Sequence, residues 1–401
     1  MAEKIVITGM GAVSPIGIGI KSFWEALLRG ECGIAEIKGI DASSLPITRA
    51  AEVKNYDPKD YLTTRQISDL DLFTQFAYIA ACEAIRSSGL DTRSGRVGIV
   101  MGTAIGGMTA TWREHEEFLS AEKQVSPRFV TRSLGNTAAA YISMDYGITG
   151  PSLTVSTACS SGGDAIVTGY LLLAADMVDA VVVMAGDSAI NPLFIDSLYK
   201  AKALSKNGDS RPFDIMRDGF VVGEGGGAIV LEKESQALAR SAEIFGVLVG
   251  CATASEAYHP VSPSPDGSGA AECMRRALRH AELLPTEIGY INAHGTSTPK
   301  GDLAESKAIC SVFGGYRVPV SSTKGSTGHM MGPGGVLEVI ACIMAINTGI
   351  LPHTVGCKEK DPECDINLIT GAPQKKEIRY AMSNAFGFGG QNSCIIVGRY
   401  K

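Results

Sequence analysis

The sequence lacks three features that would each assign it to a different class of protein. No Cys-x-x-Cys pair occurs among its ten cysteines, which argues against zinc ribbons and thioredoxin-type motifs. No basic block occurs, and 36 Lys and Arg against 42 Asp and Glu give a net charge of −6, so nucleic acid is not the expected partner. The first residues show no basic segment followed by an apolar one, as a signal peptide would. These features predict a cytoplasmic protein with reduced thiols.

Long apolar runs are also missing. Residues 339–357 carry no charge, but they include Asn347, Gly349, Pro352 and His353, whereas a membrane-spanning helix needs about 20 apolar residues. We therefore expect a buried helix and its exit there, and no membrane partner. The content of 45% hydrophobic and 19% charged residues is that of a globular chain.

Short apolar runs alternate with segments of helical spacing along the chain. Such alternation predicts βαβ units and a mostly parallel sheet in an α/β fold. The run 4–8, followed by Gly9 and Gly11, is predicted as a strand that ends in a turn. The other predicted strands are 97–101, 153–155, 180–184, 228–232, 244–249, 288–293, 318–321 and 394–397, and the predicted helices are 23–28, 68–88, 160–175, 270–281, 303–313 and 334–347. Gly89 is expected to be the C-cap of the helix 68–88.

Segments 153–175 and 318–347 share one pattern, a strand, a turn of small polar residues and an apolar helix. This repetition predicts a duplicated architecture with a boundary near residue 250. Residues 1–250 would form an N-terminal half and residues 251–401 a C-terminal half. No Pro- or Ser-rich linker separates them, so we expect one extensive interface.

The first candidate site is Val155-Ser-Thr-Ala-Cys159-Ser-Ser-Gly162-Gly163. A cysteine between a strand and a helix feels the positive end of the helix dipole, which favours the thiolate. Small neighbours allow a substrate to approach the sulfur, and backbone N–H groups can hold an oxyanion. Cys159 is therefore predicted to be a nucleophile. We expect the other nine cysteines to be structural.

Two further segments place histidines after predicted strands. Asn292-Ala-His294-Gly-Thr-Ser-Thr-Pro-Lys-Gly-Asp302 offers an imidazole that can donate to a carbonyl or take a proton. Ser321-Ser-Thr-Lys324-Gly-Ser-Thr-Gly-His329 adds a second imidazole and an amine that could bind phosphate or carboxylate. Each segment alone is also compatible with an ordinary strand–helix connection.

Two glycine-rich segments complete the pattern. Residues 384–392 hold three glycines around two phenylalanines, which predicts backbone approach to a ligand and a mobile aromatic side chain. Residues 211–228 contain a formal G-x-G-x-x-A, but a strand is predicted where a dinucleotide site requires a helix N-terminus, so we discount it.

Taken together, these segments and the start KIVITGMGAVSPIG resemble the β-ketoacyl-acyl-carrier-protein synthases of the elongating, FabF-like type, condensing enzymes of the thiolase superfamily. The resemblance covers essentially the whole chain. It implies the thiolase-like fold, in which two similar α/β halves form five layers, α-β-α-β-α. It also implies decarboxylative condensation of malonyl-acyl-carrier-protein with an acyl group held on Cys159, and a homodimer.

The resemblance assigns a role to each matching residue. Cys159 would take the acyl chain, and neutral His294 and His329 would hydrogen-bond the malonyl carbonyl and promote loss of CO2. The resemblance also implies an active-site lysine, Lys324, with Glu338 as its partner. Phe388 would act as a gate, and its N–H and that of Cys159 would form the oxyanion hole. Thr296 and Thr298 would contact the pantetheine arm, and Asp302 and Glu305 would hold the loop that carries His294.

The resemblance implies an acyl carrier protein as partner and no bound cofactor, because the carrier brings its own phosphopantetheine. It implies no catalytic metal. Asn292 and Glu305 could contribute to a structural monovalent cation, as in some members of the family.

The chain departs from the family in places that bear on its partner and primer. Gln391 stands where the family usually has Thr or His, before the last Asn of the Gly-Phe-Gly-Gly segment. Leu198 and Tyr199 replace a Phe-Gly pair near the acyl pocket. Segment 64–72 is less basic than the helix that usually docks the carrier protein. Other basic residues could supply the docking surface, namely Arg128, Arg132, Lys202 and Lys206.

Three alternatives stay open at this point. The chain could serve a specialised type II polyketide or polyene pathway, alone or as a heterodimer with a chain-length-factor-like subunit. It could be a CoA thiolase with Cys394 as its second cysteine, although Cys394 begins an apolar strand and a Cys-His-His pattern fits better. It could be a non-catalytic subunit, although such subunits lack the nucleophile.

Overall fold

The computed structural model describes residues 3–120 and 124–401. Its centre is one sheet with strand order β13-β11-β10-β15-β16-β9-β1-β8-β7-β5-β6, and β2 pairs with β1. The strands of this sheet are β1 (Ile5–Ser14), β2 (Gly17–Ile18), β5 (Val97–Gly102), β6 (Ser152–Val155), β7 (Ala180–Ser188), β8 (Glu224–Lys233), β9 (Gly246–Ser255), β10 (Ile288–Asn292), β11 (Pro319–Ser321), β13 (Asn367–Leu368), β15 (Tyr380–Gly387) and β16 (Gln391–Gly398). Two small pairs, β3 (Ala35–Glu36) with β4 (Arg49–Ala50) and β12 (Ile350–Leu351) with β14 (Gln374–Lys375), lie apart from it.

The helices cover this sheet on both faces. They are α1 (Ile20–Arg29), α2 (Thr64–Asp69), α3 (Leu72–Ser88), α4 (Met108–Ser120), α5 (Phe129–Ser133), α6 (Thr137–Tyr146), α7 (Ser161–Ala174), α8 (Pro192–Lys200), α9 (Glu234–Ala239), α10 (Ser268–Ala281), α11 (Pro299–Phe313), α12 (Lys324–Thr327) and α13 (Gly332–Thr348), with 3-10 turns at Pro58–Asp60, Pro285–Glu287 and Phe388–Gly390. No helix of the described chain is long and apolar enough to cross a membrane.

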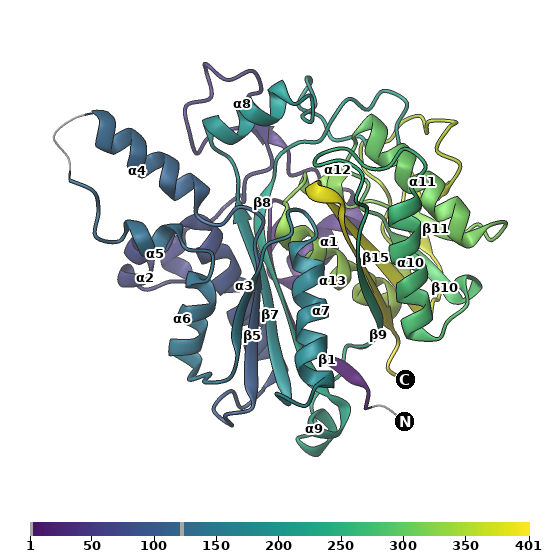
Figure 1. Ribbon diagram of the computed structural model, residues 1–401, viewed down its shortest axis with the longest axis horizontal. Coiled ribbons are helices and arrows are strands. Elements are labelled where there is room, and N and C mark those ends of the chain that lie inside the picture. Colours follow the sequence, from purple (N-terminus) through teal and green to yellow (C-terminus); the bar gives the residue numbers. More distant parts are fainter. Residues whose placement is uncertain (1–2, 121–123) are drawn as a thin grey trace.

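Five layers result, as predicted. Helix α3 packs on the outer face of β1, β7 and β8, α7 and α13 lie between the strands of the two halves, and α10 covers the outer face of β9 and β16 and packs against α11 (Figure 1). The apolar side chains form one core on each outer side and a third in the middle. Along β7 the alternation serves two of these cores, because Val181 and Val183 face the central core while Val182 and Met184 face α3.

Strand β9 joins the halves. It pairs antiparallel with β1 through Ile5 and Leu248 and antiparallel with β16 along most of its length. Since β9 itself spans residue 250, the boundary between residues 1–250 and 251–401 stays a prediction.

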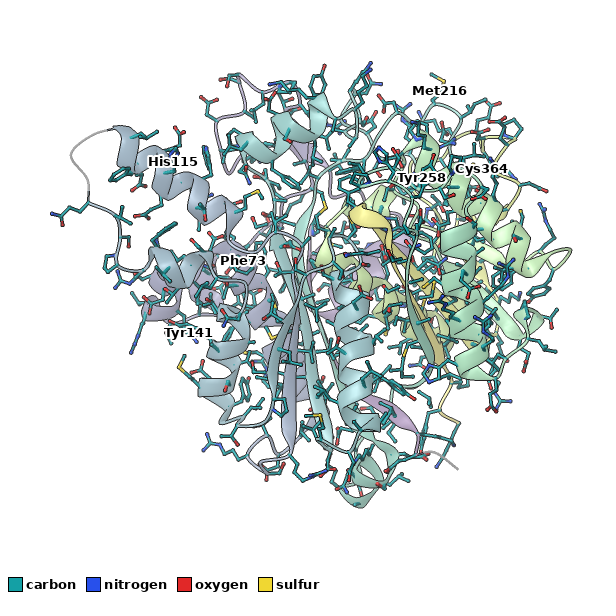
Figure 2. All side chains as sticks on the ribbon, in the orientation of Figure 1. Phe73, His115, Tyr141, Met216, Tyr258 and Cys364 are labelled. Carbon is teal, nitrogen blue, oxygen red and sulfur yellow. The ribbon has the colours of Figure 1, made fainter. Side chains whose placement is uncertain are left out.

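The turn predicted after Thr8 was wrong. Strand β1 continues through Gly9 and Gly11 to Ser14, and a Cβ on these glycines would lie 2.1 Å from the carbonyl oxygen of Ala84 and 1.9 Å from that of Ala80. These glycines let α3 approach the strand rather than turn the chain. Phe73 of the same helix is fully buried (Figure 2).

The single helix predicted over 68–88 is broken. Helix α2 ends at Asp69, Leu70 is extended (φ −107°, ψ 135°), and α3 begins at Leu72. The Gln75 side-chain amide donates to the Leu70 carbonyl at 2.9 Å, which stabilises the break. The predicted C-cap at Gly89 is confirmed, with φ 61°. Strand β15 contains no β-branched residue, so its sequence does not predict a strand, although it lies inside the sheet.

Candidate active site

Cys159 lies in the turn between β6 and α7, as the sequence predicts. Ala158 has a φ of 51°, which turns the chain sharply before the helix. The Asp164 carboxylate, in the first turn of α7, accepts hydrogen bonds from the hydroxyls of Thr157 (2.6 Å) and Ser160 (3.1 Å). These bonds fix the loop that presents the sulfur.

His329 reaches Cys159 because two helices cross closely. Its Nε2 lies 3.0 Å from the Cys159 Sγ. A Cβ on Gly162 of α7 would lie 2.3 Å from the Gly332 carbonyl oxygen, so the first turns of α7 and α13 touch backbone to backbone. The His329 N–H donates to the Val221 carbonyl at 2.7 Å, which anchors the loop before α13.

His294 completes the group from the end of β10. Its ring lies edge-on to that of His329, with centroids 5.3 Å apart at 83°. The Glu305 carboxylate on α11 accepts from the backbone N–H groups of His294 (2.9 Å) and Gly295 (2.7 Å) and from the Asn384 amide (3.1 Å). One ligand-type atom each from Cys159, His294 and His329 lies within 4.8 Å of the others.

Asp302 supports the same loop from further away. Its carboxylate accepts from the N–H groups of Ser297 (3.1 Å) and Phe213 (2.7 Å) and lies 3.6 Å from the Arg217 guanidinium. It is fully buried, and burial raises its pKa to about 7. Asp302 therefore orders the backbone after His294.

Lys324 and Glu338 form an ion pair in the interior beside this group. Both side chains are 2% exposed, and the Lys324 ammonium donates to the Glu338 carboxylate. Burial raises the pKa of Glu338 to about 7, although Lys324 opposes that shift. The pair places a positive charge next to the thiol and the imidazoles.

Burial dominates the protonation states. It lowers the pKa values of His294 and His329 well below 6.5, and Lys324 lowers both further, so both imidazoles are neutral near pH 7. Burial raises the pKa of the Cys159 thiol to about 12, although Lys324 and the N–H groups of Phe388 and Cys159 lower it. The expectation of a thiolate from the helix dipole was thus wrong for the unliganded site, because desolvation outweighs it.

The N–H groups of Cys159 and Phe388 both point at the sulfur. Phe388 begins the turn between β15 and β16 and is 37% exposed. A Cβ on the preceding Gly387 would lie 2.6 Å from the Thr157 carbonyl oxygen, so only glycine allows this turn to approach the cysteine loop. The two N–H groups have the arrangement of an oxyanion hole.

A cavity of about 400 Å³ leads from the surface to Cys159. Both imidazoles and Phe388 line it, and so do Thr296 and Thr298, whose hydroxyls lie 3.0 Å apart. Lys202 and Lys300, both exposed, lie along the same lining. The cavity therefore gives a long polar arm a path to the sulfur.

The departures noted in the sequence fall in different places. Leu198 and Tyr199 of α8 belong to the apolar cluster that contains Cys159, whereas Gln391 is not among the described residues that line the cavity. Arg128 donates to Asp69 at 2.6 Å and Arg132 donates to the Ser68 carbonyl, so both hold α5 against segment 64–72.

Sequence reasoning missed two buried carboxylates. Asp164 is described above, and an acidic residue in the first turn of a helix is a signal that could have found it. Asp187 is fully buried in β7, accepts from the Gly332 N–H (2.9 Å) and the Thr103 hydroxyl (2.7 Å), and has its pKa raised to about 6 by burial. It ties α13 to the loop after β5, a contact that local sequence patterns do not encode.

A metal ion is not implied by these contacts. Cys159, His294 and His329 are of the right type to bind one, but the Lys324 ammonium, which disfavours a charge on either imidazole, also disfavours a cation there. Among the described residues the Asn292 amide finds no hydrogen-bond partner, and it is fully buried, while Glu305 is already bound by three N–H donors. The predicted contribution of these two residues to a monovalent cation site stays a prediction.

The fold and this cysteine–histidine site are those of a thiolase-like condensing enzyme, and sequence comparison agrees. The model of the β-ketoacyl synthase N-terminal domain matches residues 2–237, and that of the C-terminal domain matches residues 245–358. The chain belongs to the β-ketoacyl synthase family.

Relatives and solved structures match over their full length. The 3-oxoacyl-acyl-carrier-protein synthase 2 of Coxiella burnetii is 38% identical over 99% of both chains, and that of Vibrio harveyi is 38% identical over 98% of both. Among solved structures, the ishigamide ketosynthase/chain length factor superposes with a TM-score of 0.95 at 29% identity, and a β-ketoacyl synthase from Burkholderia phymatum with 0.92 at 30%, each over 100% of both chains.

Proposed function

We propose that this acyltransferase condenses a malonyl thioester with an acyl group held on Cys159 and releases a β-ketoacyl-acyl-carrier-protein. The observation that carries the proposal is the contact of 3.0 Å between the Cys159 Sγ and the His329 Nε2, with His294 beside them at the end of one cavity. The full-length likeness to proteins named 3-oxoacyl-acyl-carrier-protein synthase 2 supports fatty-acid elongation as its role.

The first step transfers the acyl group. The Cys159 sulfur attacks the thioester carbonyl, a new C–S bond forms, and the bond to the arm's sulfur breaks. The thiol proton passes to the departing arm thiolate, and His329 is placed to relay it. The N–H groups of Cys159 and Phe388 hold the oxyanion of the tetrahedral intermediate. Because burial disfavours a free thiolate, this proton transfer accompanies the attack.

The second step uses both imidazoles. The malonyl carboxylate leaves as CO2, and the electron pair of the broken C–C bond forms an enolate. Neutral His294 and His329 donate to the enolate oxygen, which suits groups whose pKa values lie well below 6.5. The enolate carbon attacks the acyl carbonyl, a C–C bond forms, the C–S bond to Cys159 breaks, and the departing thiolate takes a proton from water.

The polar residues near the site have supporting roles in this proposal. The Lys324 ammonium, held in place by Glu338, favours neutral imidazoles and offsets negative charge on the sulfur. Thr296 and Thr298 contact the pantetheine arm along the cavity. Glu305 and Asp302 hold the loop that carries His294. This chemistry needs no resident cofactor or metal ion.

The partner in the proposal is an acyl carrier protein. A solved structure of a type II polyketide ketosynthase with its acyl carrier protein, 27% identical to this chain, superposes with a TM-score of 0.91. Lys202 and Lys300 at the cavity supply positive charge for an acidic carrier or for the phosphate of its arm. The predicted cytoplasmic location stays a prediction.

A homodimer fits the surface of the N-terminal half. Strand β6 lies at the edge of the sheet, and Leu153 in it is 43% exposed. Apolar side chains on neighbouring α5 and α6 are also exposed, namely Val130, Leu134 and Met144. Sedimentation of the purified chain tests this: a dimer that dissociates on Leu153→Asp supports it, and a monomer contradicts it.

Acyl transfer tests the proposed function most directly. Incubation with octanoyl-loaded acyl carrier protein should add one octanoyl group to the intact chain, and Cys159→Ala should abolish the adduct. Cys310→Ala is the matched control, because Cys310 is a partly exposed thiol on α11 and its loss should leave the adduct unchanged. An adduct that persists in Cys159→Ala contradicts the proposal. His294→Ala or His329→Ala should reduce decarboxylation of malonyl carrier more than acylation.

A specialised pathway is the second candidate. Two of the well-superposing structures are ketosynthases, described as an ishigamide and a type II polyketide enzyme, and Leu198 and Tyr199 alter the apolar cluster next to the nucleophile. Product analysis with a panel of carrier-bound primers decides: preference for polyene or polyketide intermediates, or activity only with a second subunit, favours this candidate.

A further inference from the structure

The proposed reaction requires two separate spaces at Cys159. When the malonyl arm enters along Thr296 and Thr298, the acyl group on the sulfur must already have left that cavity. Cys159 also belongs to an apolar cluster, most of whose members do not line that cavity. The acyl chain must therefore extend into this cluster. The side chain of the cluster that contacts the sulfur then also contacts the first carbons of the acyl chain.

Met331 lies at that position. Its Sδ is 4.0 Å from the Cys159 Sγ, and the residue is 4% exposed within the cluster. It is not among the described residues that line the cavity of Thr296 and Thr298. Other members of the cluster are Ile190, Ile195, Leu198, Leu204 and Phe220, with Ile105 and Tyr199 packed against it.

The backbone fixes Met331 in place. Its φ of 61° and ψ of −124° are unusual for a residue with a side chain, and it is the residue before α13. The Met331 carbonyl accepts from the Gly334 N–H at 3.2 Å, and the next N–H, of Gly332, donates to Asp187 at 2.9 Å. A side chain held in this way must make room by rotating about its own bonds.

We propose that Met331 determines which acyl groups Cys159 accepts, favouring chains that are unbranched next to the thioester. The inference rests on the proposed function. The first carbons of the acyl group need part of the volume that the Met331 thioether fills. An unbranched, flexible side chain can move aside for a linear chain. A methyl branch on the carbon next to the carbonyl needs additional volume that this movement does not supply.

The test compares two acyl groups of equal size. N-acetylcysteamine thioesters of butanoate and 2-methylpropanoate are offered to the full-length chain, and the rate of Cys159 acylation is followed by intact mass. We expect the wild-type chain to prefer butanoate and Met331→Ala to reduce that preference about tenfold, as one methyl group in an apolar pocket can do. Met331→Leu, which keeps the volume, should keep the preference within about twofold.

Met330→Ala is the matched control. Met330 is equally buried, but its sulfur lies toward Gly225, in the central core rather than the Cys159 cluster. It should lose stability without a change in preference. Met331→Gly, which suits the positive φ, replaces Met331→Ala if that variant does not fold. The inference alone is overturned if a folded Met331→Ala or Met331→Gly chain is acylated with an unchanged preference. If the wild-type chain forms no Cys159 adduct, the proposed function is overturned and the inference with it.

Discussion

Gly162→Ala is the substitution that most directly tests how the fold builds the site. The new Cβ would lie 2.3 Å from the Gly332 carbonyl oxygen, and that oxygen belongs to the backbone and cannot rotate away. Real Cβ atoms do not approach closer than about 3.0 Å, so the first turns of α7 and α13 must separate by about 0.7 Å.

Two effects of different size follow. Overpacking of this kind costs about 1–3 kcal/mol of unfolding free energy. The same shift moves His329, three residues before Gly332, away from Cys159, and lengthens their contact from 3.0 Å to about 3.7 Å, which weakens the interaction between imidazole and sulfur. Misplacement approaching 1 Å costs up to about 100-fold in rate, so we expect acylation to slow by about 10- to 100-fold while most molecules stay folded.

Chemical denaturation measures the first effect, and the rate of acylation by octanoyl-loaded carrier protein measures the second. Gly315→Ala is the control, because no atom of the residues that the structure describes lies within 4 Å of its added Cβ, and it should change stability by less than about 0.5 kcal/mol and leave the rate unchanged. A folded Gly162→Ala chain that acylates at the wild-type rate would refute the argument that close helix crossing sets the distance between thiol and imidazole.

Three further predictions concern buried ionisable groups. Because burial raises the pKa of Cys159 to about 12, alkylation by iodoacetamide should accelerate about tenfold per pH unit from about pH 7 to 9.5; a plateau below about pH 9 contradicts this. Glu338→Gln leaves the Lys324 charge buried without its partner and should cost about 3–5 kcal/mol of unfolding free energy, much of it regained when Lys324→Met is added; equal losses in the single and double variants contradict it. Burial raises the pKa of Glu224 from 4.5 to about 7, so the folded state binds a proton that the unfolded state releases. Stability should therefore fall by up to about 3 kcal/mol as the pH rises from about 4.5 to 7 and then level off. Glu224→Gln should flatten that part of the stability profile, and an unchanged slope would contradict the assignment.

The glycines show how far local patterns can be interpreted. The glycines after Thr8 predict a turn, but Gly9 and Gly11 lie inside β1, where α3 needs the space. At Gly89 the local interpretation was right, because a helix C-cap depends only on the backbone around it. The local sequence does not distinguish a glycine that lets a distant helix approach from a glycine that allows a turn.

Protonation states could not be predicted for a related reason. A helix N-terminus near Cys159 is visible in the sequence and suggests a thiolate. The depth at which the sulfur is buried is a property of the whole fold, and it raises the thiol pKa to about 12 against that dipole. The effect of desolvation on a pKa is the sum over all neighbouring atoms, most of them distant in the chain, so no local sequence pattern predicts it.

The strand-and-helix alternation, the five-layer fold and the candidates Cys159, His294 and His329 could be predicted from the amino-acid sequence, because each depends on side chains a few residues apart or on a family resemblance. The distances among the three side chains, the ion pair of Lys324 and Glu338, and the position of Met331 against the sulfur follow from the packing of distant elements. These contacts join β6, β10 and α13, which are far apart in the chain, and they exist only where packing brings those elements together.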